Sequence, residues 1–350
     1  MNNKLINNNF ELFLNYKLDD SKKNLDEEQK IVELEKLSNF ENVIKNKLIG
    51  QNHAVNSVSG TVKRSKLGLT SKTKPMGSFI FCGPTGVGKT ELAKTLAISL
   101  YGSLDFLVRF DMSEYMEPHS ISKLIGTPPG YIGYDKGGLL TESINAKPTS
   151  ILLFDEVEKA HPKVMDIFLQ ILDEGFVKDS KGRLTSFKNT IIILTSNVGS
   201  SDIFHFCKKR RIFTEKDFNI LKARLTNRLT ARFRPEFINR LDEIIVFKPL
   251  SKNSIEIILN KLLTEKINQL EKTLKAKIKI SKKAKLFILN EGFNLSFGAR
   301  HIIRSVQHHF ENGLSDFVSK HTNTLGTQIF VDKKEKNNEL FFSMIAKTQN

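Results

Sequence analysis

The chain alternates between short apolar runs and longer segments of mixed polarity. Five runs rich in β-branched and aromatic residues, at 78–82, 106–110, 150–154, 190–195 and 243–247, have the length of buried strands. Helical or loop segments separate these runs. Continuous apolar strands of this kind are typical of a parallel sheet that is covered on both faces. The pattern therefore predicts an α/β fold built on a five-stranded parallel sheet.

A change of pattern at Pro249 and Ser251 predicts a domain boundary. We expect a polar extension over residues 1–40, a large domain over 41–250, and a smaller α+β, mostly helical lid domain over 251–350. The elements expected in the small domain are a long amphipathic helix at 255–270, a strand at 275–281, helices as far as residue 317, and a β pair at 328–331 and 339–344.

Composition limits the classes of function. The formal net charge of +16 raises nucleic acid as a partner. However, the sequence is rich in Lys, Asn, Ile and Phe and has no Trp, as an AT-rich genome would produce, so nucleic acid is not the favoured partner. No apolar run approaches the roughly 18 residues of a membrane span, so we expect no membrane partner. Two distant cysteines predict neither a disulfide framework nor a zinc site.

A glycine-rich loop follows the first predicted strand. Residues 83–90 (GPTGVGKT) match the pattern GxxxxGK[ST] between a strand and a helix start. Glycines let backbone N–H groups converge on phosphate oxygens, and the helix N-terminus adds partial positive charge. In such a loop Lys89 reaches the β and γ phosphates, and the Thr90 hydroxyl ligates Mg²⁺. The predicted binding residues are Gly83, Pro84, Thr85, Gly86, Val87, Gly88, Lys89 and Thr90.

Polar residues end two later strands. Asp155 and Glu156 follow the apolar run 151–154, where the carboxyl edge of a parallel sheet binds ligands. Asp155 is suited to Mg²⁺ and Glu156 to polarising an attacking water. A solvated loop is the alternative for an isolated acidic pair. Asn197 ends the next strand, where its amide either orients the water or simply caps a helix.

Several longer motifs resemble the second, C-terminal ATPase domain of the Clp unfoldases, of the ClpC type found in bacteria and plastids. The resemblance covers residues 28 to 345. The motifs that carry it are LIGQ at 48–51, the phosphate loop, FDMSEY at 110–115, GTPPGYIGYDKGG at 126–138, FDEVEKAH at 154–161, FKNTIIILTSNVGS at 187–200, FRPEFINRLD at 233–242 and GAR at 298–300.

The resemblance implies a P-loop AAA+ ATPase with ATP and Mg²⁺ as cofactors, and it gives further residues a role. Ile49 would help to line the adenine site. Tyr131 resembles the pore-loop aromatic that grips a polypeptide, although a buried tyrosine in an ordinary turn is the alternative. Arg240 resembles the arginine finger that acts on a neighbouring subunit, with a salt bridge to Asp242 or Glu243 as the alternative. Arg300 resembles the sensor arginine of the small domain.

The same resemblance implies partners. It predicts a homo-oligomeric ring, hexameric as in its family, or a mixed ring with another Clp subunit, and unfolded polypeptide as substrate. The first ATPase ring and the N-terminal substrate domain of the family are not found in the sequence. Residues 208–214 lack the glycine of the tripeptide that docks on the Clp peptidase, so peptidase coupling is an open expectation.

Two other functions stay open at this stage: a nucleic-acid-dependent AAA+ motor, and a non-catalytic ring subunit that needs a larger Clp partner. The composition and the absence of a presequence favour an organelle-encoded protein of the plastid stroma, similar to an apicoplast protein. A bacterial-type cytoplasm is the alternative.

Overall fold

The computed structural model describes residues 39–71, 73–127, 137–208, 214–321, 326–334 and 339–345. Its centre is a five-stranded sheet of order β2-β3-β6-β1-β7, in which every pairing is parallel. The strands are β1 (Gly77–Cys82), β2 (Leu107–Asp111), β3 (Ser150–Asp155), β6 (Thr190–Ser196) and β7 (Glu243–Val246). The five predicted strands are confirmed, with bounds that differ by one residue.

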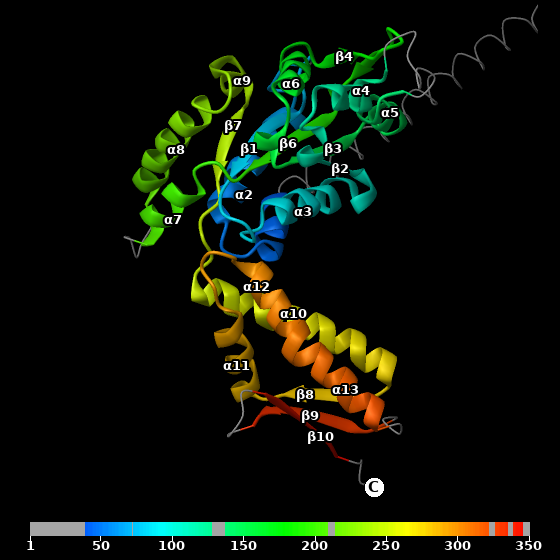
Figure 1. Cartoon of the computed structure of the whole chain (residues 1–350), viewed down its shortest axis with the longest axis vertical. Helices are drawn as coiled ribbons and strands as arrows, with labels where there is room; N and C mark the ends of the chain where they lie inside the picture. The colour runs from blue at the N-terminus through cyan, green and yellow to red at the C-terminus, as the bar shows by residue number, and fades with distance from the viewer. Residues whose placement is uncertain are drawn as a thin grey trace, which may run out of the picture.

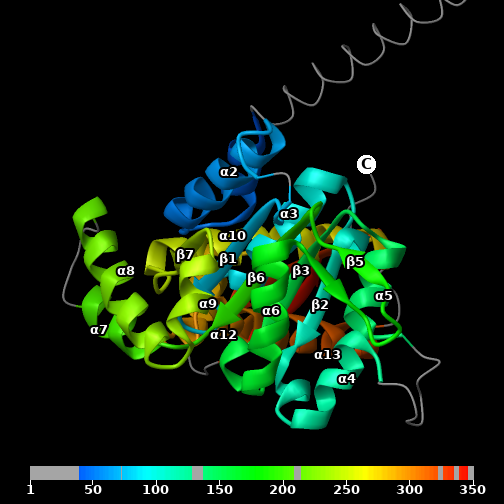
Figure 2. The same ribbon diagram turned by 90° about the horizontal axis from the view of Figure 1, so that it is seen from above.

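Both faces of this sheet are covered, which explains why the strands are apolar at consecutive positions. Phe79 and Phe81 pack with α2 (Asn52–Lys66) and α3 (Lys89–Tyr101) on one face. Ile80 and Cys82 point into the core on the other face. In Figure 2 the helices of that second face lie in front of the sheet and to either side of it. They include α5 (Leu139–Ala146), α6 (Pro162–Glu174), α7 (Ser200–Lys208), α8 (Glu215–Thr230) and α9 (Pro235–Arg240).

The residues from Leu250 onward form a separate hydrophobic cluster of their own. Figure 1 shows their helices and strands below the central sheet. In this cluster, α10 (Lys252–Leu274) and shorter helices pack on a three-stranded sheet of order β10-β9-β8. The predicted long helix, the following strand and the final β pair are all found. The elements are α11 (Lys282–Gly292), α12 (Ala299–Ser305), the π-helical η5 (Val306–Glu311), α13 (Asn312–Lys320), β8 (Lys277–Ile280), β9 (Gln328–Lys333) and β10 (Leu340–Ile345).

Some elements were not predicted from the sequence. The hairpin of β4 (Phe176–Lys178) and β5 (Leu184–Ser186) has three residues in each strand, too few for a period-2 pattern to be recognised. Short helical turns such as η4 (Val157–Lys159) and α4 (Ile121–Ile125) were also missed. Within the described ranges, no helix combines the length and the apolarity that crossing a bilayer requires.

Two glycines that end helices of equal length allow a matched test of packing. Gly102 ends α3 and Gly175 ends α6, and both have positive φ, at 79° and 73°. A Cβ on Gly102 meets nothing within 4 Å, whereas a Cβ on Gly175 would overlap the carbonyl oxygen of Thr73. We expect Gly102→Ala to cost about 1 kcal/mol in the free energy of unfolding, and Gly175→Ala about 1–3 kcal/mol more. Urea titration measures both, and equal losses would contradict the packing of this turn.

Candidate functional site

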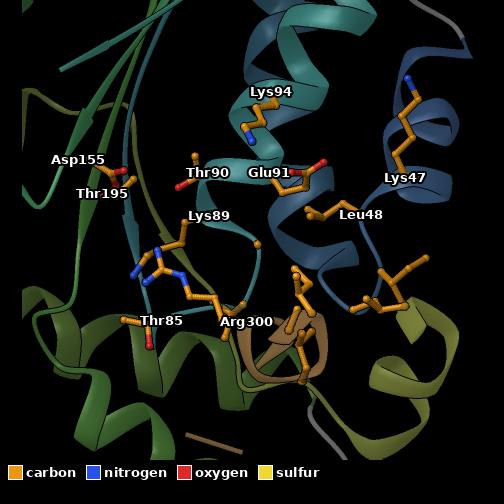
Figure 3. Close-up of a pocket in the computed structure, with 18 of the residues that line it drawn as sticks. Lys47, Leu48, Thr85, Lys89, Thr90, Glu91, Lys94, Asp155, Thr195 and Arg300 are labelled. Carbon is orange, nitrogen blue, oxygen red and sulfur yellow. Dashed lines mark hydrogen bonds between the residues drawn. The ribbon is translucent and has the colours of Figure 1, made fainter. Parts of the chain in front are cut away.

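A cleft of about 1000 Å³ lies at the carboxyl ends of the strands, between the sheet and the small domain. Its lining brings together residues that are distant in the sequence, from the loop after β1, the ends of β3 and β6, and helices α10 and α12. Figure 3 shows Lys89, Arg300, Asp155 and Thr195 arranged around this space. Of the predicted site residues, those that line it are Ile49, Thr85, Gly86, Val87, Gly88, Lys89, Thr90, Asp155, Glu156, Asn197 and Arg300.

The glycine-rich loop has the backbone that its sequence predicts. Gly86 and Gly88 have φ of 72° and 108°, which disfavours any residue with a Cβ. A Cβ on Gly83 would lie 2.5 Å from the carbonyl oxygen of Phe247. The loop leads directly into α3, whose first N–H groups have no acceptor within the helix. This arrangement fits the phosphates of a nucleotide, because those N–H groups and the helix N-terminus favour an anion.

Lys89 is held by acceptors from two strand ends. Its Nζ donates to Asn197 Oδ1 at 2.8 Å, to the Ser196 carbonyl at 3.2 Å, to the Pro84 carbonyl at 3.3 Å and to the Gly83 carbonyl. Burial lowers the pKa of the Lys89 ammonium to about 8, because desolvation disfavours the charged form. A partly buried cation whose hydrogen-bond acceptors are neutral is well placed to attract an anionic phosphate.

Asp155 is buried, and both of its carboxylate oxygens accept hydrogen bonds. Its carboxylate accepts from the Thr195 hydroxyl and, at 2.7 Å, from the Arg109 guanidinium. Thr90 lies on the first turn of α3 and lines the same cleft. A hydroxyl and a carboxylate are the oxygen donors that Mg²⁺ prefers, so the residues fit this cation.

Glu156 has an unusual backbone for a residue with a side chain. Its φ of 58° is in the left-handed region, and its N–H donates to Thr195 Oγ1 at 3.1 Å. Its carboxylate pairs with Lys159 at 2.5 Å. Backbone strain of this kind costs about 1–3 kcal/mol and persists where the surroundings fix it, commonly at functional sites.

Asn197 does not act as a helix cap with its side chain. Its amide oxygen accepts from Lys89, and its backbone N–H donates to Glu158 Oε1 at 2.9 Å. The amide therefore faces the phosphate loop, as the functional interpretation requires.

The small domain closes the cleft through the start of α12. The N–H of Ala299 donates to the Gly86 carbonyl at 2.8 Å, and Gly298 has φ of 54° at this close approach. Arg300 follows directly and lines the cleft, as does Ile49. A buried glutamine strengthens the same region: Gln51 donates to the carbonyls of Val87 at 3.1 Å and Lys248 at 2.8 Å.

Three predicted residues of the described chain, Gly83, Pro84 and Arg240, do not line the cleft. The carbonyls of Gly83 and Pro84 instead accept from Lys89. Tyr131 lies outside the described residues. Arg240, at the end of α9, pairs with Asp173 of α6 at 2.8 Å. The alternative of a salt bridge to Asp242 or Glu243 is therefore wrong, because Asp242 accepts from Ser78 and Glu243 pairs with Lys222.

The roles of Arg109, Gln51 and the Thr195 hydroxyl were not predicted from the sequence. Arg109 interrupts an apolar strand, and a charge at such a position was the available signal. It lies two residues before Asp111, which is in register with Asp155 of the neighbouring strand. That register brings Arg109 to the carboxylate, and it is not visible in the sequence.

Two protein families match this chain. Residues 74–244 match the AAA domain (Cdc48 subfamily), and residues 250–331 match the C-terminal, D2-small domain, of ClpB protein. Together they account for most of the described chain, and they meet between the large and small hydrophobic clusters. The expected P-loop AAA+ fold is confirmed.

Curated relatives agree with these matches. The chain is 46% identical over 308 residues to the chaperone protein ClpB of Bacillus anthracis, which covers 88% of this chain and 35% of that protein. It is 43% identical over 306 residues to the ATP-dependent Clp protease ATP-binding subunit ClpC of Staphylococcus epidermidis. That alignment covers 87% of this chain and 37% of the ClpC protein. The ClpC protein of Staphylococcus aureus strain USA300 is 44% identical. The chain thus spans little more than a third of the length of these relatives, and the resemblance to a second Clp ATPase domain is confirmed.

The lowered pKa of Lys89 makes a prediction for triphosphate binding. Bound phosphate favours the charged ammonium, so above about pH 8 the chain should take up a proton on binding, and affinity should fall as pH rises, by up to about tenfold per unit. Calorimetry at about pH 9 in two buffers of different ionisation enthalpy measures the proton uptake. Lys94→Met, which removes another lysine that lines the cleft, should retain the proton uptake on binding. Equal heats in both buffers would contradict the role of Lys89.

Proposed function

The chain belongs to the Clp-type AAA+ ATPases, and from this premise we propose that it binds ATP with Mg²⁺ in the cleft and hydrolyses it. The observation that carries the proposal is the convergence of Lys89, Asp155, Asn197 and Arg300 on one cleft from four separate segments. We also propose that the chain is divided at residue 250 into a large ATPase domain and a lid domain, after an extension that ends near residue 40.

Each of these residues has a distinct task in the proposed reaction. Lys89 holds the β and γ phosphates, and Thr90 and Asp155 hold Mg²⁺, which neutralises charge on the phosphates when bound. Glu156 polarises the attacking water, and Asn197 orients that water or senses the γ phosphate. Ile49 contacts the adenine, and Arg300 links the nucleotide to the small domain. The Arg109 guanidinium competes with Mg²⁺ for the carboxylate of Asp155.

We propose that hydrolysis takes place in a ring. Arg240 does not line the cleft of its own chain, and its side chain is about half exposed. Both observations are consistent with contact between Arg240 and the nucleotide of a neighbouring protomer. A guanidinium supplied in this way contributes about 10³–10⁵ in rate, because it neutralises charge in the transition state. The ring is a hexamer of this chain or a mixed ring with another Clp subunit.

We propose unfolded polypeptide as the substrate, drawn through the central pore of the ring by Tyr131. The support is the Gly-Tyr-Ile-Gly sequence at residues 130–133, which offers an aromatic contact between glycines. Coupling to a Clp peptidase is a weaker proposal, because residues 208–214 lack the docking glycine. The place of action that we propose is the plastid stroma, with a bacterial-type cytoplasm as the alternative.

Two other functions are outcomes of the same experiments. A nucleic-acid motor, favoured by the net charge of +16, would show ATPase activity that DNA stimulates and that salt suppresses. A non-catalytic ring subunit would bind ATP without turnover unless a larger Clp partner is added.

Replacement of the proposed water-polarising group separates binding from hydrolysis. Glu156→Gln should bind ATP as the wild type does and lose about 10²-fold or more in kcat, because the amide cannot accept the proton of the water. Equilibrium binding of a fluorescent ATP analogue and phosphate release measure the two effects. Glu174→Gln, at an exposed position of α6, is the matched control. Normal turnover by Glu156→Gln would refute the assignment.

Replacement of the pore-loop aromatic separates hydrolysis from threading. Tyr131→Ala should keep ATPase activity within about threefold of the wild type and lose the unfolding of a tagged fluorescent protein, since the aromatic face supplies the grip. Tyr131→Phe retains the ring and should retain unfolding. Undiminished unfolding by the alanine variant would exclude Tyr131 as the gripping residue.

A further inference from the structure

Glu158, which has no task in the proposed reaction, lies directly behind the candidate site. It belongs to the short turn η4 that follows Asp155 and Glu156. Its Oε1 accepts the backbone N–H of Asn197 at 2.9 Å. Its Oε2 is buried and has no hydrogen-bond donor among the described residues. A carboxylate that is only half satisfied is a costly way to stabilise a fold, so the position favours a functional role.

The backbone of the same residue reaches a second segment. The carbonyl of Glu158 accepts from Nη2 of Arg232 at 2.8 Å. Arg232 lies in the turn between α8 and α9, eight positions before Arg240 in the sequence. One residue therefore contacts both the strand end that carries Asn197 and the turn that leads to Arg240.

The helix α9 is held firmly to the elements around this turn. Arg234, at its start, pairs with Asp166 of α6 at 2.7 Å, and Arg240, at its end, pairs with Asp173 of the same helix. Under α9, the ring of Phe237 lies 6.2 Å from that of Phe168, which in turn lies 4.7 Å from Phe154 of β3. A displacement of the turn at Arg232 thus moves α9 together with α6, because packed interiors transmit strain.

We propose that Glu158 is a positioning residue that connects Asn197 to the segment carrying Arg240. Through this connection, the nucleotide bound in one cleft controls the position in which Arg240 is presented to the neighbouring protomer. Lys89 is the first link, since it donates to Asn197 at 2.8 Å and is the group that phosphate attracts. A shift of Asn197 is passed to Glu158 and from there to Arg232. This inference rests on the proposed function, because Arg240 meets a second nucleotide only in a ring.

Single variants give the first part of the test. Glu158→Ala should bind ATP within about threefold of the wild type and lose about tenfold in kcat, the value of one hydrogen bond of about 1.4 kcal/mol. Glu158→Gln keeps an acceptor for Asn197 and should retain most activity. Glu174→Ala removes an exposed carboxylate at the end of α6 and should have no effect. A Glu158→Ala protein with the kcat of the wild type would overturn the inference.

Mixed assemblies show whether the loss acts on the neighbouring protomer. Glu156→Gln has an inactive cleft but a normal Arg240, so equal amounts of Glu156→Gln and Glu158→Ala should hydrolyse ATP faster than the sum of the two alone. Arg240→Ala mixed with Glu156→Gln should recover in the same way, and Lys89→Ala mixed with Glu156→Gln should not. Recovery with Arg240→Ala but not with Glu158→Ala would assign Glu158 to its own cleft and overturn the inference.

The remaining outcomes are also decisive. If neither mixture recovers, the role of Arg240 in a neighbouring cleft is refuted, and the inference falls with it. If the wild-type chain itself has no ATPase activity, the proposed function fails first. If circular dichroism shows that Glu158→Ala does not fold, Arg232→Ala is used instead, because it removes the hydrogen bond between Arg232 and the Glu158 carbonyl. That variant leaves the contact between Glu158 and Asn197 intact and should recover in the same mixture.

Discussion

The partly buried ammonium of Lys89 is the constraint on which the geometry of the cleft depends. A cation removed from water needs several acceptors, and these come from the loop after β1 and from the end of β6. The two strands are neighbours in the sheet, so Ser196 and Asn197 lie within reach. The next strand, β3, brings Asp155 to the same edge through the Thr195 hydroxyl. The strand order is therefore what assembles one polar site at the edge of an apolar sheet.

The small domain takes part in the shape of the phosphate loop. The N–H of Ala299 holds the Gly86 carbonyl, and Gly298 allows the two backbones to approach closely. Gln51 ties the same loop to Lys248, just before the small domain begins. Because the loop has hydrogen bonds on both sides of the cleft, a change in what it holds also changes the contacts between the two domains. This mechanical connection is the property that a nucleotide-driven motor requires.

Much of this arrangement could be predicted from the sequence, and the reasons for failure are specific. The strands were found because both of their faces are buried, which makes them apolar throughout. The loop at residues 83–90 was found because its glycines and lysine are adjacent in the chain. Arg109 was missed because it meets Asp155 only through the pairing of β2 with β3. The alternative considered for Arg240 was a salt bridge to acidic residues nearby in the sequence, whereas α9 lies against α6 and Arg240 pairs with Asp173.

By itself, the sequence determined the strands of the central sheet, the phosphate loop and the acidic strand end, because these depend on residues within one turn or one strand of each other. Only the tertiary structure decided which side chains meet across strands: Arg109 with Asp155, Asn197 with Lys89, and Glu158 with Asn197 and Arg232. Those contacts follow from strand order and register, to which residues far apart in the chain contribute. A local pattern carries no record of such neighbours, so many residues that line the cleft could be predicted, while their contacts with the turn before α9 could not.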